Sequence, residues 1–148
     1  MICGSTLDTR DLPVSCSQPT ALNLYEKAVS QYQRYVGDPV ATIEEVLRHA
    51  PDFTLRYLFR AVVLMMMSEQ RLVRDARASV DAARALLPYA NSRERLLTAA
   101  ATELVNGDWD EACAVFDSVL VDYPRDAFAI QSAHLLDFFR GDSLNLST

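Results

Sequence analysis

The sequence contains few of the residues that build tight turns, disulfides and metal sites. Four glycines and six prolines in 148 residues are too few for the many turns of an all-β fold. The three cysteines, Cys3, Cys16 and Cys113, show no paired spacing, which argues against disulfides and a zinc site. The two histidines, His49 and His134, have no acidic neighbour at metal-ligand spacing. We therefore expect a reducing, cytoplasmic setting, with no metal and no cofactor.

Long hydrophobic runs are also missing. The most apolar stretch, residues 61–67, is far shorter than the roughly twenty residues that a membrane-spanning helix needs. The first residues carry acidic side chains and no extended apolar segment, so they do not form a secretory signal. These absences predict a protein that does not contact a membrane.

Positive charge is in the minority. The chain has 14 Lys and Arg against 20 Asp and Glu, for a net charge of −6. Because nucleic-acid binding depends on a basic surface, this balance argues against a nucleic-acid partner. Several arginines gather between residues 56 and 84, and a solvated helix surface is the simplest interpretation of that stretch.

The residues that are abundant favour helix. Alanine, leucine, arginine and glutamate are plentiful, and no segment alternates as a strand would. Caps and breakers predict an irregular leader over residues 1–19 and then about seven helices. The helices are expected at residues 21–36, 39–49, 53–66, 72–87, 93–105, 109–123 and 127–141. Expected N-terminal caps are Thr20, Asp38, Asp52, Asp108 and Asp126.

The residues that end or begin these helices recur at a regular spacing. The helix-ending residues Pro51, Pro88 and Pro124 are spaced by 37 and 36 residues, and Gly-Asp pairs begin at Gly37, Gly107 and Gly141. A period of about 35 residues indicates stacked helical hairpins. The two glycines at 37 and 107 are expected in the left-handed conformation that ends a helix or turns into the next one.

One stretch carries a family resemblance. "GDWDEA", followed by Phe116, Leu120 and Pro124, resembles the turn and second helix of the tetratricopeptide repeat, with Leu96 and Ala100 at matching positions of the first helix. Departures are mild: Val119 and Glu103 stand where the family prefers Ala and Tyr. The resemblance implies an α-solenoid of antiparallel hairpins in a right-handed superhelix. Its units would cover residues 20–51, 52–88, 92–124 and, in part, 126–148.

The order of segments is similar to a narrower family. "YVGDPVATIEEVL", "NSRERLLTAA" and "GDW" occur in the order found in the N-terminal part of the tetratricopeptide repeat protein 38 family. That similarity implies a helical-repeat protein without known catalytic residues. Since the family is longer, it also implies an alternative, in which the chain is an N-terminal structural fragment whose working site lies beyond residue 148.

The repeat resemblance implies a function as well. First helices of such hairpins line a concave groove that binds a peptide or helix. We therefore expect a non-enzymatic protein-interaction scaffold whose partner is anchored by Arg56 or Arg60. The matching groove residues are Arg56, Arg60, Val63, Glu94, Leu97, Ala101, Phe128, Gln131, Leu135 and Phe138.

Two other features carry alternatives. "GDSL" at residues 141–144 resembles the nucleophile motif of an esterase family, but no histidine follows Ser143 to activate it, so a hydrolase is the remote alternative and we expect no catalytic residue.

The last expected helix lacks a hairpin partner, which would begin near Ser143. Phe138 and Phe139 should then be partly exposed, which predicts self-association there or a truncated array.

Overall fold

The computed structural model describes residues 6–7, 13–14, 19–34, 36–49, 53–67 and 70–147 of the chain. Seven α-helices dominate these ranges, which confirms the all-α fold class. They are α1 (Pro19–Arg34), α2 (Pro39–His49), α3 (Thr54–Met66), α4 (Val73–Ala85), α5 (Ser92–Val105), α6 (Trp109–Asp122) and α7 (Ala127–Ser147). Short 3-10 turns, η1 (Gln70–Leu72) and η2 (Leu87–Tyr89), flank α4.

One small ribbon precedes the helices. Strand β1 (Thr6–Leu7) pairs antiparallel with β2 (Pro13–Val14), so that Thr6 lies opposite Val14. This pairing was not predictable from the sequence, because two residues are too few to show the alternation by which strands are recognised.

Three aspartates begin helices as their positions predict. The side-chain Oδ1 atoms of Asp38, Asp108 and Asp126 accept hydrogen bonds from the backbone N–H three residues later, at 3.0, 3.0 and 3.1 Å. Each bond satisfies a backbone donor that the first helical turn leaves without a partner. The helices α2, α6 and α7 therefore start where the sequence places them.

The two predicted left-handed glycines are confirmed. Gly37 has φ 69° and Gly107 has φ 90°, a region that residues with a side chain rarely adopt. Gly37 turns the chain from α1 into α2, and Gly107 turns it from α5 into α6. These two turns let consecutive helices fold back on each other.

Several predicted helix ends are wrong. Helix α1 begins at Pro19, so Thr20 lies inside it, because the fixed φ of proline suits the first helical position. Helix α7 does not end at Gly141 but continues to Ser147, so no hairpin partner begins at Ser143. Glycine keeps its N–H, and a helix can pass through it at a cost of about 1 kcal/mol. The expected cap Asp52 lies outside the described residues.

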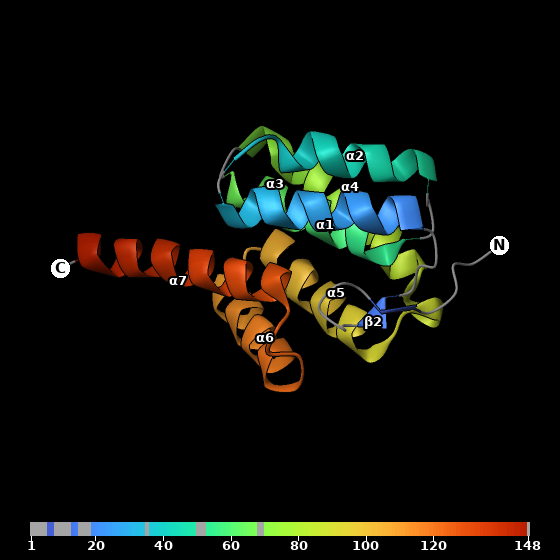
Figure 1. Cartoon of the computed structure of the whole chain (residues 1–148). Coiled ribbons are helices and arrows are strands. Elements are labelled where there is room, and N and C mark those ends of the chain that lie inside the picture. The colour runs from blue at the N-terminus through green and yellow to red at the C-terminus, as the bar shows by residue number, and fades with distance from the viewer. Residues whose placement is uncertain are drawn as a thin grey trace.

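The helices pack in sequential pairs. Helix α1 lies against α2, α3 against α4, and α5 against α6, while α3 also contacts α5 (Figure 1). The first part of α7 lies against α6, α1 and α3, and its later part projects away from the other helices. The first part of α7 thus packs against the first helix of the chain, α1.

Aromatic side chains fill the space where these helices meet. Phe128 of α7 packs against Tyr32 of α1, Phe59 of α3 and Phe116 of α6, with ring centroids 5.5 to 6.3 Å apart. All four rings are buried. Such tilted and edge-to-face contacts stabilise the fold by about 0.5–1.5 kcal/mol per pair beyond the burial of apolar area. The aromatic cluster is therefore the part of the core that holds α7 on α1.

A buried ion pair joins the starts of α5 and α7. Arg93 Nη1 donates to Asp126 Oδ2 at 2.7 Å, and the two side chains are 1% and 2% exposed. The other oxygen of Asp126 caps α7. One carboxylate thus begins a helix and neutralises a buried cation that lies 33 residues earlier in the chain.

Candidate functional site

The structure buries most of the predicted groove residues. Seven of them are buried, and each faces its own fold instead of solvent: Arg56, Val63, Glu94, Leu97, Ala101, Phe128 and Gln131. Glu94 forms a capping box with Asn91 at the start of α5, and Phe128 belongs to the aromatic cluster. The apolar members of this set therefore serve as core and offer no open groove in this structure.

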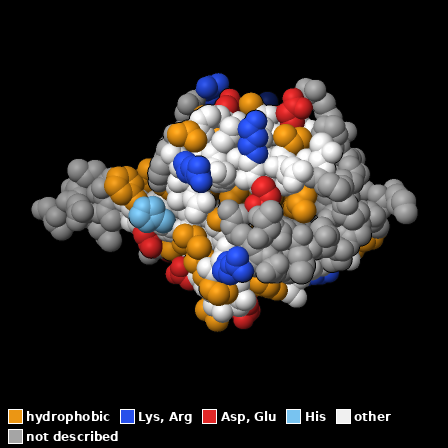
Figure 2. Space-filling model, in the orientation of Figure 1, with side chains coloured by type: hydrophobic (Ala, Val, Ile, Leu, Met, Phe, Trp, Pro, Cys, Tyr) orange, Lys and Arg blue, Asp and Glu red, His pale blue; other side chains and the backbone are white. Residues whose placement is uncertain are grey.

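The remaining predicted groove residues lie nearer the surface. Arg60 and Leu135 are half-buried, and Phe138 is 57% exposed. Phe139 packs edge-on against Trp109 of α6, with ring centroids 6.0 Å apart. The predicted exposure of Phe138 is therefore present. On the face drawn in Figure 2, hydrophobic, basic and acidic side chains of the described residues are interspersed.

Both predicted anchors line one pocket. Arg56 and Arg60 lie one helical turn apart on α3 and line a hollow of about 250 Å³ between α2, α3 and α4. The other lining residues are Glu44, Tyr57, Ala78, Ser79 and Ala82. We call this hollow the arginine pocket. Its lining carries one more positive than negative charge, in a chain whose net charge is −6.

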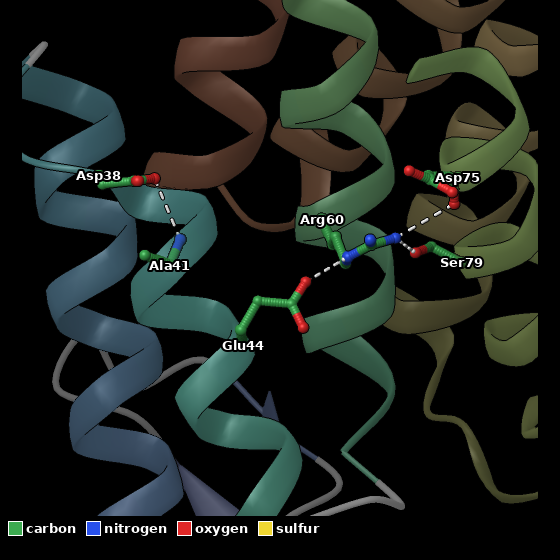
Figure 3. A network of polar contacts seen from close by, with 6 residues as sticks. All are labelled: Asp38, Ala41, Glu44, Arg60, Asp75 and Ser79. Atoms are coloured by element: carbon green, nitrogen blue, oxygen red, sulfur yellow. Dashed lines mark hydrogen bonds and ion pairs between the residues drawn. The ribbon is translucent and has the colours of Figure 1, made fainter. Parts of the chain in front are cut away.

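Arg60 ties the three walls of the arginine pocket together (Figure 3). Its Nε donates to Glu44 Oε1 of α2 at 2.5 Å, and its Nη1 donates to Ser79 Oγ and to the Asp75 carbonyl of α4 at 2.7 and 3.2 Å. The Arg60–Glu44 pair is partly exposed to solvent, so its contribution to stability is about 1 kcal/mol or less. Arg60 therefore joins α3 to α2 and α4 through these hydrogen bonds and fixes the shape of the pocket.

Arg56 has a different environment. It is 3% exposed, and its guanidinium carbon lies 3.6 Å from the centroid of the Tyr57 ring, a cation–π contact. Burial, with a smaller effect from the positive charge of Arg60, lowers the pKa of Arg56, while Tyr57 and Glu44 oppose that shift. The negative charge of Glu44 favours the charged form of Arg56, because charges interact more strongly away from bulk water.

The other candidate groups do not assemble into a site. Ser143 lies within α7, not after a strand. His134 is exposed, and the side chain of His49 lies outside the described residues. Among the side chains that the structure describes, no group of three or more His, Cys, Asp or Glu could hold a metal ion. No described helix is both long and apolar enough to cross a membrane.

Sequence reasoning missed two features near these sites. The capping box of Asn91 and Glu94 follows the usual spacing of such caps, so it was visible in the sequence. The arginine pocket had no local signal, since its walls come from residues 44 to 82 of three helices. No protein-family model matches the chain, and no solved structure matches it at a significant level.

Proposed function

We propose that the chain is a non-enzymatic protein-interaction scaffold built of tetratricopeptide-like hairpins. Sequential pairing of α1 with α2, α3 with α4 and α5 with α6 supports this proposal, as does the contact between the first helices α3 and α5. The left-handed Gly107 in "GDWDEA" and the cap at Asp108 fit the turn of such a repeat. In a scaffold of this kind, the hairpins hold side chains of several helices at fixed positions for a partner.

The arginine pocket is the observation that carries the proposal. Since α7 packs on α1 and α3 and the aromatic cluster there is buried, the partner is proposed to contact the surface between α2, α3 and α4 instead. Arg56 is the anchor there, and Arg60 is a positioning residue that holds Glu44 and Ser79 in place. Arginine is suited to this role because its planar group binds carboxylates in a two-point geometry.

A peptide selection on the full chain tests this function. Peptides are selected from a random display library and their affinities are measured by calorimetry on the wild type, Arg56→Gln and Arg84→Gln. Arg84 is exposed and lines a different pocket, of about 260 Å³, so it is a matched control. We expect a loss of about tenfold or more for Arg56→Gln and none for Arg84→Gln. Selection of no saturable binder, or binders insensitive to Arg56→Gln, would contradict the proposal.

A further inference from the structure

We infer that the exposed side of α7 binds the same side of a second copy of this chain, with the two helices antiparallel and a two-fold axis at His134. This inference goes beyond the proposed function and does not rest on it. The arginine pocket lies on α2, α3 and α4, so a failure at one surface leaves the other standing.

Three exposed side chains form one stripe along α7. Ile130 is 42% exposed and Phe138 is 57% exposed, and the exposed His134 lies midway between them in the sequence. A spacing of four residues places all three on the same side of a helix. Figure 2 shows the pale-blue histidine with hydrophobic side chains on either side of it. We call Ile130, His134 and Phe138 the α7 stripe.

The core of the chain is built on the other side of α7. Phe128, Ser132 and Leu136 repeat at the same spacing as the α7 stripe, and all three are buried. Phe139 packs against Trp109, so this ring is partly engaged within its own chain. A helix that packs on one side and exposes two large apolar side chains on the other is typical of an interaction surface.

The order of side chains in the α7 stripe favours a second copy as the occupant. The stripe reads apolar, histidine, apolar in both directions. An antiparallel copy therefore places Ile130 opposite Phe138 twice and His134 beside its own equivalent. A two-fold contact requires such a self-complementary surface, because each pair of residues then occurs twice. Side chains four residues apart also form the ridge that packs in the commonest class of helix crossing.

The shape of the molecule fits an antiparallel pair. The first part of α7 packs on α6, α1 and α3, while its later part projects away from the other helices (Figure 1). A pair centred on His134 sets the projecting part of each copy beside the first part of α7 of the other copy. The packed helices of the two copies then lie at opposite ends of the pair, whereas a parallel pair would bring them to the same end.

Charge and size determine the strength of the contact. Each copy carries a net charge of −6, so two copies repel, and none of the three stripe residues is acidic. Two apolar side chains from each copy form a small interface of the weak, transient class, with a dissociation constant on the order of 0.1–1 mM. Added salt should strengthen the association, because it screens the repulsion between the copies.

Sedimentation velocity of the full chain over a concentration series tests the inference. We expect the weight-average sedimentation coefficient of the wild type to rise with concentration, and Ile130→Ser or Phe138→Ser to weaken the association about tenfold or more. The matched control is Val121→Ser, which removes an 81% exposed apolar side chain of α6 and should change nothing. A wild type that stays monomeric above the expected dissociation constant, or an equal loss in Val121→Ser, would overturn the inference.

His134 tests the position of the axis. His134→Leu should tighten the association severalfold, since it places two apolar side chains together on the axis. His134→Asp should abolish it, because two like charges then meet there. If neither variant changes the association, the axis is not at His134.

A mixture of two charged variants tests the antiparallel arrangement. Ile130→Asp and Phe138→Lys, each checked for folding by circular dichroism, should be monomeric when alone. In the mixture, an antiparallel pair brings the introduced aspartate opposite the introduced lysine and keeps one contact between Ile130 and Phe138. Association should therefore return in the mixture and weaken with salt. A parallel pair would not oppose the two charges, so a mixture that stays monomeric would refute the antiparallel pair.

Discussion

Replacing Asp126 by asparagine separates the two tasks of this residue. Asp126 Oδ1 caps α7 through the Ala129 N–H at 3.1 Å, and Oδ2 accepts from Arg93 at 2.7 Å. Asparagine retains an oxygen for the cap, and its capping strength is similar to that of aspartate. The substitution therefore removes the negative charge and leaves the start of α7 intact.

The expected loss is large because the pair is buried. Both side chains are at most 2% exposed, and deleting one charge of a buried pair costs about 3–5 kcal/mol. A domain of this size unfolds with a free energy of about 5–15 kcal/mol. The loss corresponds to a fall in melting temperature of about 6–20 °C, since each kcal/mol lowers it by about 2–4 °C in a domain of this length.

Urea unfolding followed by circular dichroism measures the effect. The matched control is Asp108→Asn, at an exposed cap of the same type, for which we expect a change within about 0.5 kcal/mol. An Arg93→Met, Asp126→Asn double variant removes the buried cation as well and should regain about 2 kcal/mol over Asp126→Asn alone. If Asp126→Asn and Asp108→Asn lose the same free energy, the buried pair does not hold α7 to α5.

Three further predictions concern the core, two turns and the exposed Phe138 of α7. Phe128→Ala should lower the free energy of unfolding in urea by about 3–5 kcal/mol, because Phe128 is 1% exposed in the aromatic cluster. A loss below about 1 kcal/mol would contradict the place of Phe128 in the core. Gly107→Ala should cost about 1–2 kcal/mol from its φ of 90° alone, since nothing lies within 4 Å of an added Cβ. Gly37→Ala should cost more, because its Cβ would meet the Gln31 side chain, which binds Thr42; equal losses would contradict this. The proposed self-association through α7 predicts a molar mass that rises with concentration in light scattering and that Phe138→Ser keeps monomeric, whereas a constant monomer mass for the wild type rules it out.

Local chemistry in the sequence determined much of the fold. Asp38, Asp108 and Asp126 cap helices within three residues of themselves, and Gly37 and Gly107 need positive φ for reasons that a short window contains. These features were predictable because the partners of each residue are its neighbours in the chain. The continuation of α7 through Gly141 was not predictable, because whether a helix ends at a glycine depends on free-energy differences of about 1 kcal/mol.

The candidate site was predictable only in part. Matching positions in a repeat selected Arg56 and Arg60, and the structure brings these two into one pocket. The same matching selected Phe128 and Leu97 as groove residues, and these are core. The return of α7 onto α1, marked by the Tyr32 and Ser132 hydroxyls at 3.1 Å, spans 100 residues. The periodicity of a single repeat carries no information about a contact between α1 and α7.

Binding of a library-selected peptide to variants of two arginines tests the central claim most directly. The peptide is labelled with a fluorophore and titrated with the wild type, Arg56→Gln and Arg84→Gln at constant ionic strength. We predict that Arg56→Gln weakens the binding of the peptide about tenfold or more, while Arg84→Gln leaves it unchanged. A peptide whose affinity is unchanged by Arg56→Gln would show that the arginine pocket is not where this protein meets its partner.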